Sequence, residues 1–212
     1  MPVLPPPNPF PRHATFFRLP AGASLHRLHD RAYGPDEFNP GKGQPSRFAP
    51  IRDAAGRTIP TLYAGTSYEC AAFEYVFHDV VHDQPVKTVP LSRIAPLCHS
   101  ALRPLRDLLL VQLFEADLNA WGATRADVIA TLPAAYPQTA RWAEAIHTAQ
   151  PRAHGLVWTS RRCDPDLCVV LFGDRVTPGT LQVRSTVPLA ASDGELGQIE
   201  GFAARAGIAI TL

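Results

Sequence analysis

The sequence predicts a single α+β domain in which short strands are interrupted by helices. Several apolar runs have the length of buried strands, and three segments show start signals or apolar spacing typical of helices. No internal repeat and no clear linker divides the 212 residues, 46% of which are hydrophobic. This length and composition suit one sizeable globular core.

Strands are expected where apolar and β-branched residues run between turn signals. These segments are residues 24–33, 61–65, 86–94, 154–160, 167–173 and 180–187. The run DLLLVQLF (107–114) fits either a buried strand or part of a helix, and the terminal IAITL is compatible with a last strand. Residues 34–60, rich in Gly, Pro and charge, predict a long loop, which in a compact domain is usually functional.

One helix is predicted to begin at Thr66, because Thr66 and Glu69 have the T-x-x-E spacing of a capping box. Gly65 allows a tight turn before this helix, and Pro85 is expected to end it. Further helical segments are expected at 138–149, which is amphipathic, at 194–207, and in part of 115–137.

The first of these helices contains CAAFEYVF (70–77), in which a single glutamate, Glu74, stands among apolar and aromatic residues. On a helix its neighbours three and four positions away include Ala71, Phe77 and His78, and only His78 is polar. A carboxylate on a buried helix must be paired, protonated or facing a cavity. Glu74 is therefore either a structural residue paired with an arginine or part of a functional site.

The overall composition argues against several classes of protein. A net charge of +1 provides no field that would recruit nucleic acid or a membrane surface, and no apolar run approaches the roughly 20 residues that span a bilayer. The four cysteines form no C-x-x-C pair and are expected to be small buried hydrophobes. Residues 1–20 hold seven prolines and predict an extended arm, either loose or lying on the domain; they contain no signal-peptide core, so a cytoplasmic protein is expected.

His78, Asp79 and His82 imitate part of the H-E-x-x-H motif, in which two histidines one helical turn apart bind zinc. The acid here is the shorter aspartate, and no third ligand follows at the expected spacing. A metal-dependent hydrolase is therefore a weak alternative. The simpler interpretation is a polar helix end, where the helix dipole favours protonated histidine.

Three further residues are candidates for a site, although each has an ordinary structural explanation. Arg47, in QPSRFAP, lies in the long loop, where it would either grip a phosphate or be solvated. Tyr63 precedes the turn into the Glu74 helix and would line a site or pack in the core. Ser160 ends an apolar run, where a serine commonly caps a turn.

Four segments of the chain resemble, in their order, the motifs of the RES-domain family, the toxins of bacterial RES–Xre toxin–antitoxin pairs. These segments are SRF, TLYAGTSYECAAFEYVFH, HGLVWTSRR and LCVVLFG. The family is named for an arginine, a glutamate and a serine. The matching positions are Arg47, Tyr63, Glu74 and Ser160, together with His78 at a position that is often histidine. The likeness covers roughly residues 24–190 and is most specific at 61–78.

The sequence departs from the family's pattern near the arginine. A serine stands where a glycine before Arg47 is usual, and the interval from Arg47 to Glu74 is longer than in a typical member. Three other arginines therefore remain alternatives for binding phosphate: Arg27, Arg52 and Arg57.

The resemblance implies a fold like that of the ADP-ribosyltransferases, with a split β-sheet core and helices around an NAD cleft, in a catalytic domain spanning 21–212 after the arm. Members of the family break the nicotinamide–ribose bond of NAD⁺ and pass ADP-ribose to water, phosphate or a target protein, with no metal required. An Xre-type helix-turn-helix antitoxin usually covers the cleft, and a higher-order toxin–antitoxin complex is expected. The alternative is a catalytically inactive RES-like module that binds a nucleotide or the antitoxin.

The resemblance also assigns roles to the matching residues, with Glu74, Arg47 and Ser160 as the expected catalytic residues. Glu74 would stabilise the positive charge that develops on ribose as the glycosidic bond breaks, which accounts for a carboxylate in an apolar wall. Arg47 would clamp the pyrophosphate, and Tyr63 would stack on nicotinamide or ribose. Ser160 would hydrogen-bond the ribose or the amide, and His78 would contact NAD⁺ as well. Which acceptor takes the ADP-ribose stays open.

Overall fold

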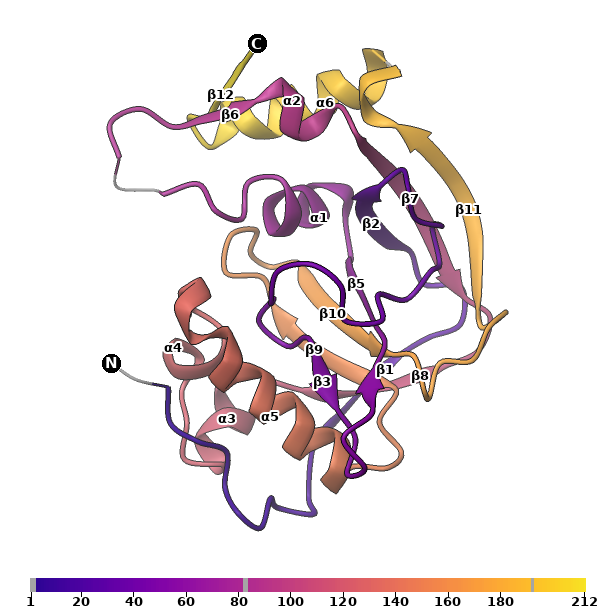
Figure 1. The fold of residues 1–212 in the computed structure, drawn as a ribbon, viewed down its shortest axis with the longest axis vertical. Coiled ribbons are helices and arrows are strands. Elements are labelled where there is room, and N and C mark those ends of the chain that lie inside the picture. The colour runs from indigo at the N-terminus through magenta and orange to yellow at the C-terminus, as the bar shows by residue number, and fades with distance from the viewer. Residues whose placement is uncertain (1–2, 82–83, 192) are drawn as a thin grey trace.

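The computed structural model describes residues 3–81, 84–191 and 193–212. Its main feature is a curled sheet of eight strands: β1 (Phe16–Leu19), β2 (Leu25–Asp30), β5 (Thr61–Gly65), β7 (Leu97–Pro104), β8 (Leu108–Gln112), β9 (Gly155–Thr159), β10 (Leu167–Phe172) and β11 (Leu181–Pro188). The strands follow the order β1-β8-β9-β10-β5-β2-β7-β11 across the sheet, and neighbours are antiparallel except β8 and β9 (Figure 1). The α+β class predicted from the sequence is confirmed.

The sheet is split between β5 and β2. β5 pairs with β10 over five residues and β2 pairs with β7 over six, yet β5 and β2 meet only where His26 faces Gly65. Figure 1 shows β7 and β11 rising away from β9 and β10, with α1 (Tyr68–Tyr75) lying beside β2 and β5. The split core that the family resemblance implies is therefore present.

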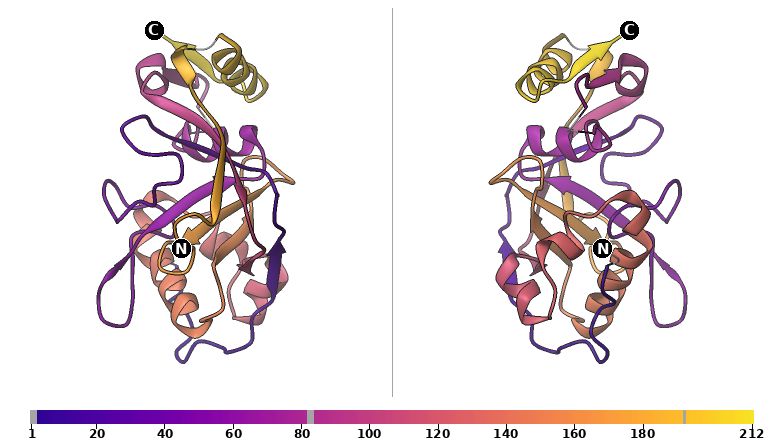
Figure 2. Two further views of the ribbon diagram at one scale, coloured as in Figure 1. Left: turned by 90° about the vertical axis from the view of Figure 1, so that its right-hand side faces the viewer. Right: turned by 90° about the vertical axis from the view of Figure 1, so that its left-hand side faces the viewer.

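The remaining elements gather at the two ends of the molecule (Figures 1 and 2). The end near the N-terminus holds α3 (Glu115–Ala120), α4 (Arg125–Val128) and α5 (Tyr136–Ala149), and the opposite end holds α2 (Leu91–Ile94), α6 (Asp193–Arg205) and the parallel pair β6 (Thr88–Pro90) and β12 (Ala209–Thr211). Within the long loop, β3 (Ile51–Arg52) and β4 (Thr58–Ile59) form a small hairpin. Among the described residues, no helix is long and apolar enough to span a membrane.

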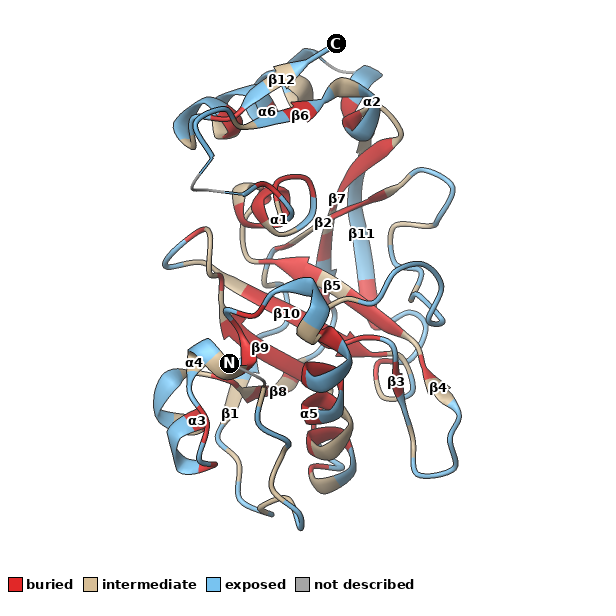
Figure 3. Ribbon diagram, turned by 60° about the vertical axis from the view of Figure 1, so that its left-hand side comes forward, coloured by how far each residue is buried: buried red, intermediate tan, exposed pale blue. Residues whose placement is uncertain are grey.

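β10 shows how the sheet is buried on both faces. Cys168, Val170 and Phe172 belong to the core cluster that includes α1, whereas Val169 and Leu171 belong to a second cluster. Because successive side chains of a strand point to opposite faces, a strand covered on both sides forms a continuous apolar run, as LCVVLF does. In Figure 3 the central strands are accordingly buried, whereas the edge strand β11 is largely exposed.

The predicted elements are largely present, and the ambiguous run at 107–114 forms a strand, β8. One prediction was wrong in part: within 86–94 only the three residues of β6 are extended, and the short helix α2 follows. The sequence also missed the short strands β1, β3 and β4 and, immediately after α2, the eight-residue strand β7. His99 and Ser100 are buried in it, so polar side chains interrupt the apolar pattern that would have predicted it.

The helix that carries Glu74 begins one residue later than predicted. Ser67 is its N-cap, because the Ser67 hydroxyl accepts a hydrogen bond from the amide of Cys70 at 3.0 Å. The Thr66 hydroxyl instead donates to the carboxylate of Asp166. The capping box predicted from Thr66 was therefore wrong. The Ser67 hydroxyl caps the helix, and Asp166, distant in sequence, binds the Thr66 hydroxyl instead.

The same helix ends at Tyr75, well before Pro85. The amide of Phe77 donates to a carbonyl five residues earlier, which breaks the regular i→i−4 pattern. His78 therefore lies in the turn beyond the helix, and its predicted position one helical turn after Glu74 was wrong.

The proline-rich arm lies on the domain. The indole nitrogen of Trp142 donates to the carbonyl of Leu4 at 2.8 Å, and the amide nitrogen of Gln150 donates to the carbonyls of Pro11 and Arg12 at 3.0 Å. The last part of the 1–20 segment is the edge strand β1. The arm is therefore anchored by α5 and then joins the sheet.

Candidate active site

A cleft of about 510 Å³ is lined by residues of β2, the 34–49 loop, β5 and α1. Four of the five predicted site residues line it: Arg47, Tyr63, Glu74 and His78. The fifth, Ser160, is fully buried and contacts Glu74 from behind. A cleft of this volume falls within the range of roughly 300–1,000 Å³ usual for small-molecule sites. The fold thus brings together residues that are up to 113 positions apart in the sequence.

Glu74 is fixed by the turn that follows β9. Its Oε1 accepts a hydrogen bond from the Ser160 hydroxyl at 2.6 Å. The Ser160 oxygen in turn accepts bonds from the amides of Arg162 and Cys163, each at 3.1 Å. Ser160 therefore caps its turn, which is the structural role expected from the sequence. It also orients the Glu74 carboxylate. Because two backbone donors hold the serine oxygen, its proton is directed to Glu74.

Arg47 lies on the other side of the same carboxylate. Its Nη1 is 3.8 Å from Glu74 Oε2, and its Cζ lies 5.7 Å from the centre of the Tyr136 ring. Only 4% of the Arg47 side chain is exposed, and its Nε and Nη2 have no hydrogen-bond partner among the described residues. The glutamate–arginine pair is therefore present but too long for a hydrogen bond, and two guanidinium donors lack an acceptor.

Tyr63 holds the loop that positions Arg47. Its hydroxyl oxygen accepts hydrogen bonds from the Phe48 amide at 2.9 Å and from the Ser46 hydroxyl at 3.1 Å. Burial raises the pKa of Tyr63 to about 12, so the phenol remains protonated at neutral pH. The ring lines the cleft, and it meets Trp158 edge-on at 6.2 Å. Tyr63 therefore links β5 to the loop on both sides of Arg47.

His78 meets a residue that the sequence did not indicate. Its Nε2 accepts a hydrogen bond from the Tyr136 hydroxyl at 2.8 Å, and its Nδ1 lies 2.8 Å from Asp79. Burial is the main cause that lowers the pKa of His78, which favours neutral imidazole. Tyr136 begins α5, and no motif around it marks it as a site residue. Only the fold places its ring between His78 and Arg47.

The metal interpretation finds no support in the geometry of His78. Both of its ring nitrogens already face Asp79 or Tyr136, and His82 lies outside the described residues. Within residues 3–81, 84–191 and 193–212, no group of three or more His, Cys, Asp and Glu side chains is arranged to hold a metal ion.

Two of the four candidate arginines line the cleft. Arg47 does so beside Glu74, and Arg27 does so from β2, where its Nη1 donates to the carbonyls of Pro35 and Glu37 at 2.8 Å. Burial lowers the pKa of Arg27 to about 10, which leaves it charged at neutral pH. The other two, Arg52 and Arg57, lie on or beside the β3–β4 hairpin and do not line the cleft.

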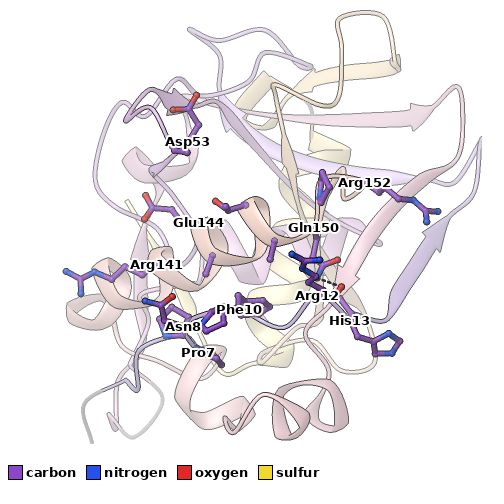
Figure 4. A pocket seen from close by; sticks show the side chains of 18 of the residues that line it. Pro7, Asn8, Phe10, Arg12, His13, Asp53, Arg141, Glu144, Gln150 and Arg152 are labelled. Carbon is purple, nitrogen blue, oxygen red and sulfur yellow. Dashed lines mark hydrogen bonds between the residues drawn. The ribbon is translucent and has the colours of Figure 1, made fainter.

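A larger hollow of about 1,210 Å³ lies between the N-terminal arm and α5. Figure 4 shows its charged side chains spread along the groove, with Arg141 and Arg152 at opposite ends and pointing apart. None of the five predicted site residues lines it, although Arg52, one of the alternative arginines, does. The convergence of charged and aromatic groups therefore favours the smaller cleft as the candidate active site.

A family model described as the RES domain matches residues 24–192, and the chain belongs to this family. The search of curated proteins found no match. Among solved structures, the chain is similar to a chain of the structure entitled "Crystal structure of the M.tuberculosis MbcT-MbcA toxin-antitoxin complex". The TM-score is 0.58 and the sequence identity is 14%. The alignment covers 88% of this chain and 92% of that one. At this identity the likeness shows a shared fold, and it extends over nearly the whole domain.

Proposed function

We propose that this chain is a toxin that cleaves the bond between nicotinamide and ribose in cytoplasmic NAD⁺. The observation that carries the proposal is Glu74, a carboxylate in the cleft wall with one oxygen fixed by Ser160 and the other 3.8 Å from Arg47. Membership of the RES family and the fold shared with a toxin–antitoxin protein support this function.

The chemistry requires a fixed negative charge more than a strong acid. When the bond to the cationic nicotinamide ring breaks, its electron pair neutralises that ring, and positive charge develops on the ribose. A carboxylate held in place before the reaction stabilises that charge without reorganisation. Glu74 supplies the carboxylate, and Ser160 acts through it as a positioning residue. The ribosyl cation is then captured by water, phosphate or a protein side chain.

The two cleft arginines are suited to the pyrophosphate of NAD⁺. Arg47 has two guanidinium donors without a protein acceptor among the described residues, and a buried donor left unpaired costs roughly 1–3 kcal/mol. These two nitrogens are closed to solvent, so a phosphate oxygen would satisfy them only after the surrounding loop shifts. Arg27 lies in the same cleft, so a diphosphate spanning both would be held through two guanidinium groups. Tyr63 also lines the cleft and would pack against the nicotinamide or its ribose.

The proposed partner is an Xre-type helix-turn-helix antitoxin that covers this cleft in a higher-order complex. Tyr33 and Tyr75 line the cleft and are 44% and 45% exposed, so their rings are available at its mouth. Exposed tyrosine rings are well suited to a protein interface, because they bury much area at little entropic cost.

The test is release of nicotinamide from NAD⁺ by the purified full chain, with and without phosphate. We expect release that falls in Glu74→Gln and persists in Glu200→Gln, a matched change at an exposed glutamate on α6. Faster release in phosphate would identify phosphate as the acceptor. No release by the folded chain, free of antitoxin and supplemented with cell extract, would favour an inactive RES-like module that binds a nucleotide or antitoxin.

A further inference from the structure

Three side chains from three separate elements form a chain that ends in the wall of the cleft. Glu195, in the first turn of α6, lies 3.0 Å from Nδ1 of His99 on β7. Nε2 of His99 lies 2.9 Å from Nδ1 of His26 on β2. His26 lines the cleft, at the position where β2 meets β5 across the split. The carboxylate is thereby connected to the cleft through two imidazole rings.

The chemistry of these contacts determines which nitrogens carry protons. A carboxylate only accepts, so His99 donates from Nδ1 and, when neutral, accepts at Nε2. His26 must then donate from Nδ1, which leaves its Nε2 as an acceptor. Within the described residues, Nε2 of His26 has no hydrogen-bond partner and is not among the buried unpartnered atoms. An accessible acceptor therefore faces the cleft.

The histidine pair is closely packed and mostly shielded from solvent. The ring of Tyr68 stacks on His99 at 3.8 Å with an interplanar angle of 4°, and His99 is 8% exposed. Burial is the main cause that lowers the pKa of both His26 and His99, which keeps the pair neutral near pH 7. Glu195 lies beyond residue 192, where the match to the family model ends. The chain of contacts thus depends on a helix outside the matched segment.

The position of His26 indicates which part of a ligand it would meet. His26 faces Gly65, just before α1, whereas Glu74 lies seven residues after the N-cap Ser67. That interval places Glu74 about 10 Å further along the helix axis. His26 is therefore remote from the bond that Glu74 would act on. A neutral acceptor binds no phosphate oxygen, so its partner is a hydroxyl or amino group.

We propose that His26 binds the adenosine half of the dinucleotide by accepting a hydrogen bond at Nε2 from a ribose hydroxyl or the adenine amino group. His99 and Glu195 are positioning residues that hold His26 in the accepting tautomer. This inference rests on the proposed function for the identity of the ligand, and it adds a specificity residue to that site.

The test compares two fragments of NAD⁺ by calorimetry with the full chain: AMP, which carries the adenosine half, and nicotinamide mononucleotide. We expect His26→Ala to weaken AMP binding roughly five- to tenfold, the value of one hydrogen bond, and to leave the other fragment unaffected. His26→Asn, whose amide oxygen accepts, restores part of the affinity. Glu195→Gln, which no longer fixes the tautomer, gives an intermediate loss. His13→Ala, on the exposed arm, is the matched control.

A pH series separates this role from a structural one. Protonation converts Nε2 of His26 into a donor, so AMP affinity falls more steeply as the pH is lowered than it does in His26→Asn, whose remaining dependence comes from protonation of the AMP phosphate itself. The charged and titratable groups that act on His26 are His99, Glu195 and Asp166, and none of them is altered in that variant. Three results would overturn the inference. The unsubstituted chain and His26→Ala could bind AMP with equal affinity, His26→Ala could lose affinity equally for both fragments, or the chain could bind no AMP at all. Because binding needs no turnover, these results are independent of nicotinamide release.

Discussion

The two ends of the cleft present their polar groups in opposite ways. At one end a carboxylate, Glu74, faces the cleft itself, and Ser160 behind it fixes its direction. At the other end the carboxylate, Glu195, is set back, and His99 and His26 connect it to the wall. Of these two carboxylates, only Glu74 faces the ligand directly, where in our proposal positive charge develops; Asp30 and Glu37 also line the cleft. The remote end offers a neutral acceptor, which suits recognition without reaction.

The largest expected effect comes from removing the charge at the reactive end. Glu74→Gln keeps an oxygen that accepts from Ser160 but removes the negative charge, so nicotinamide release should fall about 10²–10³-fold. The free energy of unfolding should change by no more than about 1 kcal/mol, since the amide is isosteric and stays hydrogen-bonded. Initial rates and urea denaturation measure the two quantities. A parallel loss of stability and activity would indicate a structural glutamate instead.

The second prediction distinguishes the hydrogen bond that positions Glu74 from the negative charge that Glu74 carries. Ser160→Ala removes the acceptor for the amides of Arg162 and Cys163, which should lower the free energy of unfolding by about 1–3 kcal/mol. The carboxylate would remain but lose its orientation, so kcat should fall about tenfold, less than in Glu74→Gln. Ser185→Ala, at an exposed position of β11, is the control for urea denaturation and rate. Unchanged stability would contradict the capping role.

A smaller effect is expected at the loop that carries Arg47. Tyr63→Phe removes the acceptor for the Phe48 amide and Ser46 hydroxyl, so the loop on both sides of Arg47 loses its link to β5. KM for NAD⁺ should rise about fivefold, the value of one hydrogen bond, with kcat nearly constant. Steady-state kinetics measure both parameters. A fall in kcat with constant KM would show that the phenol acts on the reaction and not on the loop.

The histidines predict a moderate dependence of stability on pH. Burial lowers the pKa of six of them in the folded chain: His26, His29, His78, His99, His147 and His154. Below the unfolded value of about 6.5 the unfolded chain binds more protons, so stability falls as the pH decreases, by at most about 1.4 kcal/mol per pH unit for each histidine. Urea denaturation at pH 7.5 and 5.5 measures the loss. Higher stability at pH 5.5 would contradict it.

The parts of the fold that the sequence predicted are those with a local cause. LCVVLF reads as a strand because β10 is apolar on both faces, and the amphipathic run of α5 reads as a helix. β7 was missed, since its buried His99 and Ser100 are satisfied by partners on other strands and on α6. No local pattern contains that information.

The candidate site likewise contains some residues that the sequence indicates and others that only the fold brings to the site. Glu74 could be recognised because a carboxylate in an apolar run is locally anomalous, and motif order added Arg47 and Ser160. Tyr136 and His26 could not be recognised, because their significance lies in contacts with residues 58 and 73 positions away. Sequence reasoning finds residues that conflict with their surroundings in the chain, whereas residues that complete a site from a distance require the fold.

The most direct test of NAD⁺ cleavage follows one sample of the purified chain and NAD⁺ by proton NMR. We expect NAD⁺ signals to decay while nicotinamide signals grow in equal amount, and we expect Glu74→Gln to bind NAD⁺ but leave both sets of signals nearly constant. NAD⁺ that stays intact beside a folded, antitoxin-free chain that binds it would contradict the proposed cleavage.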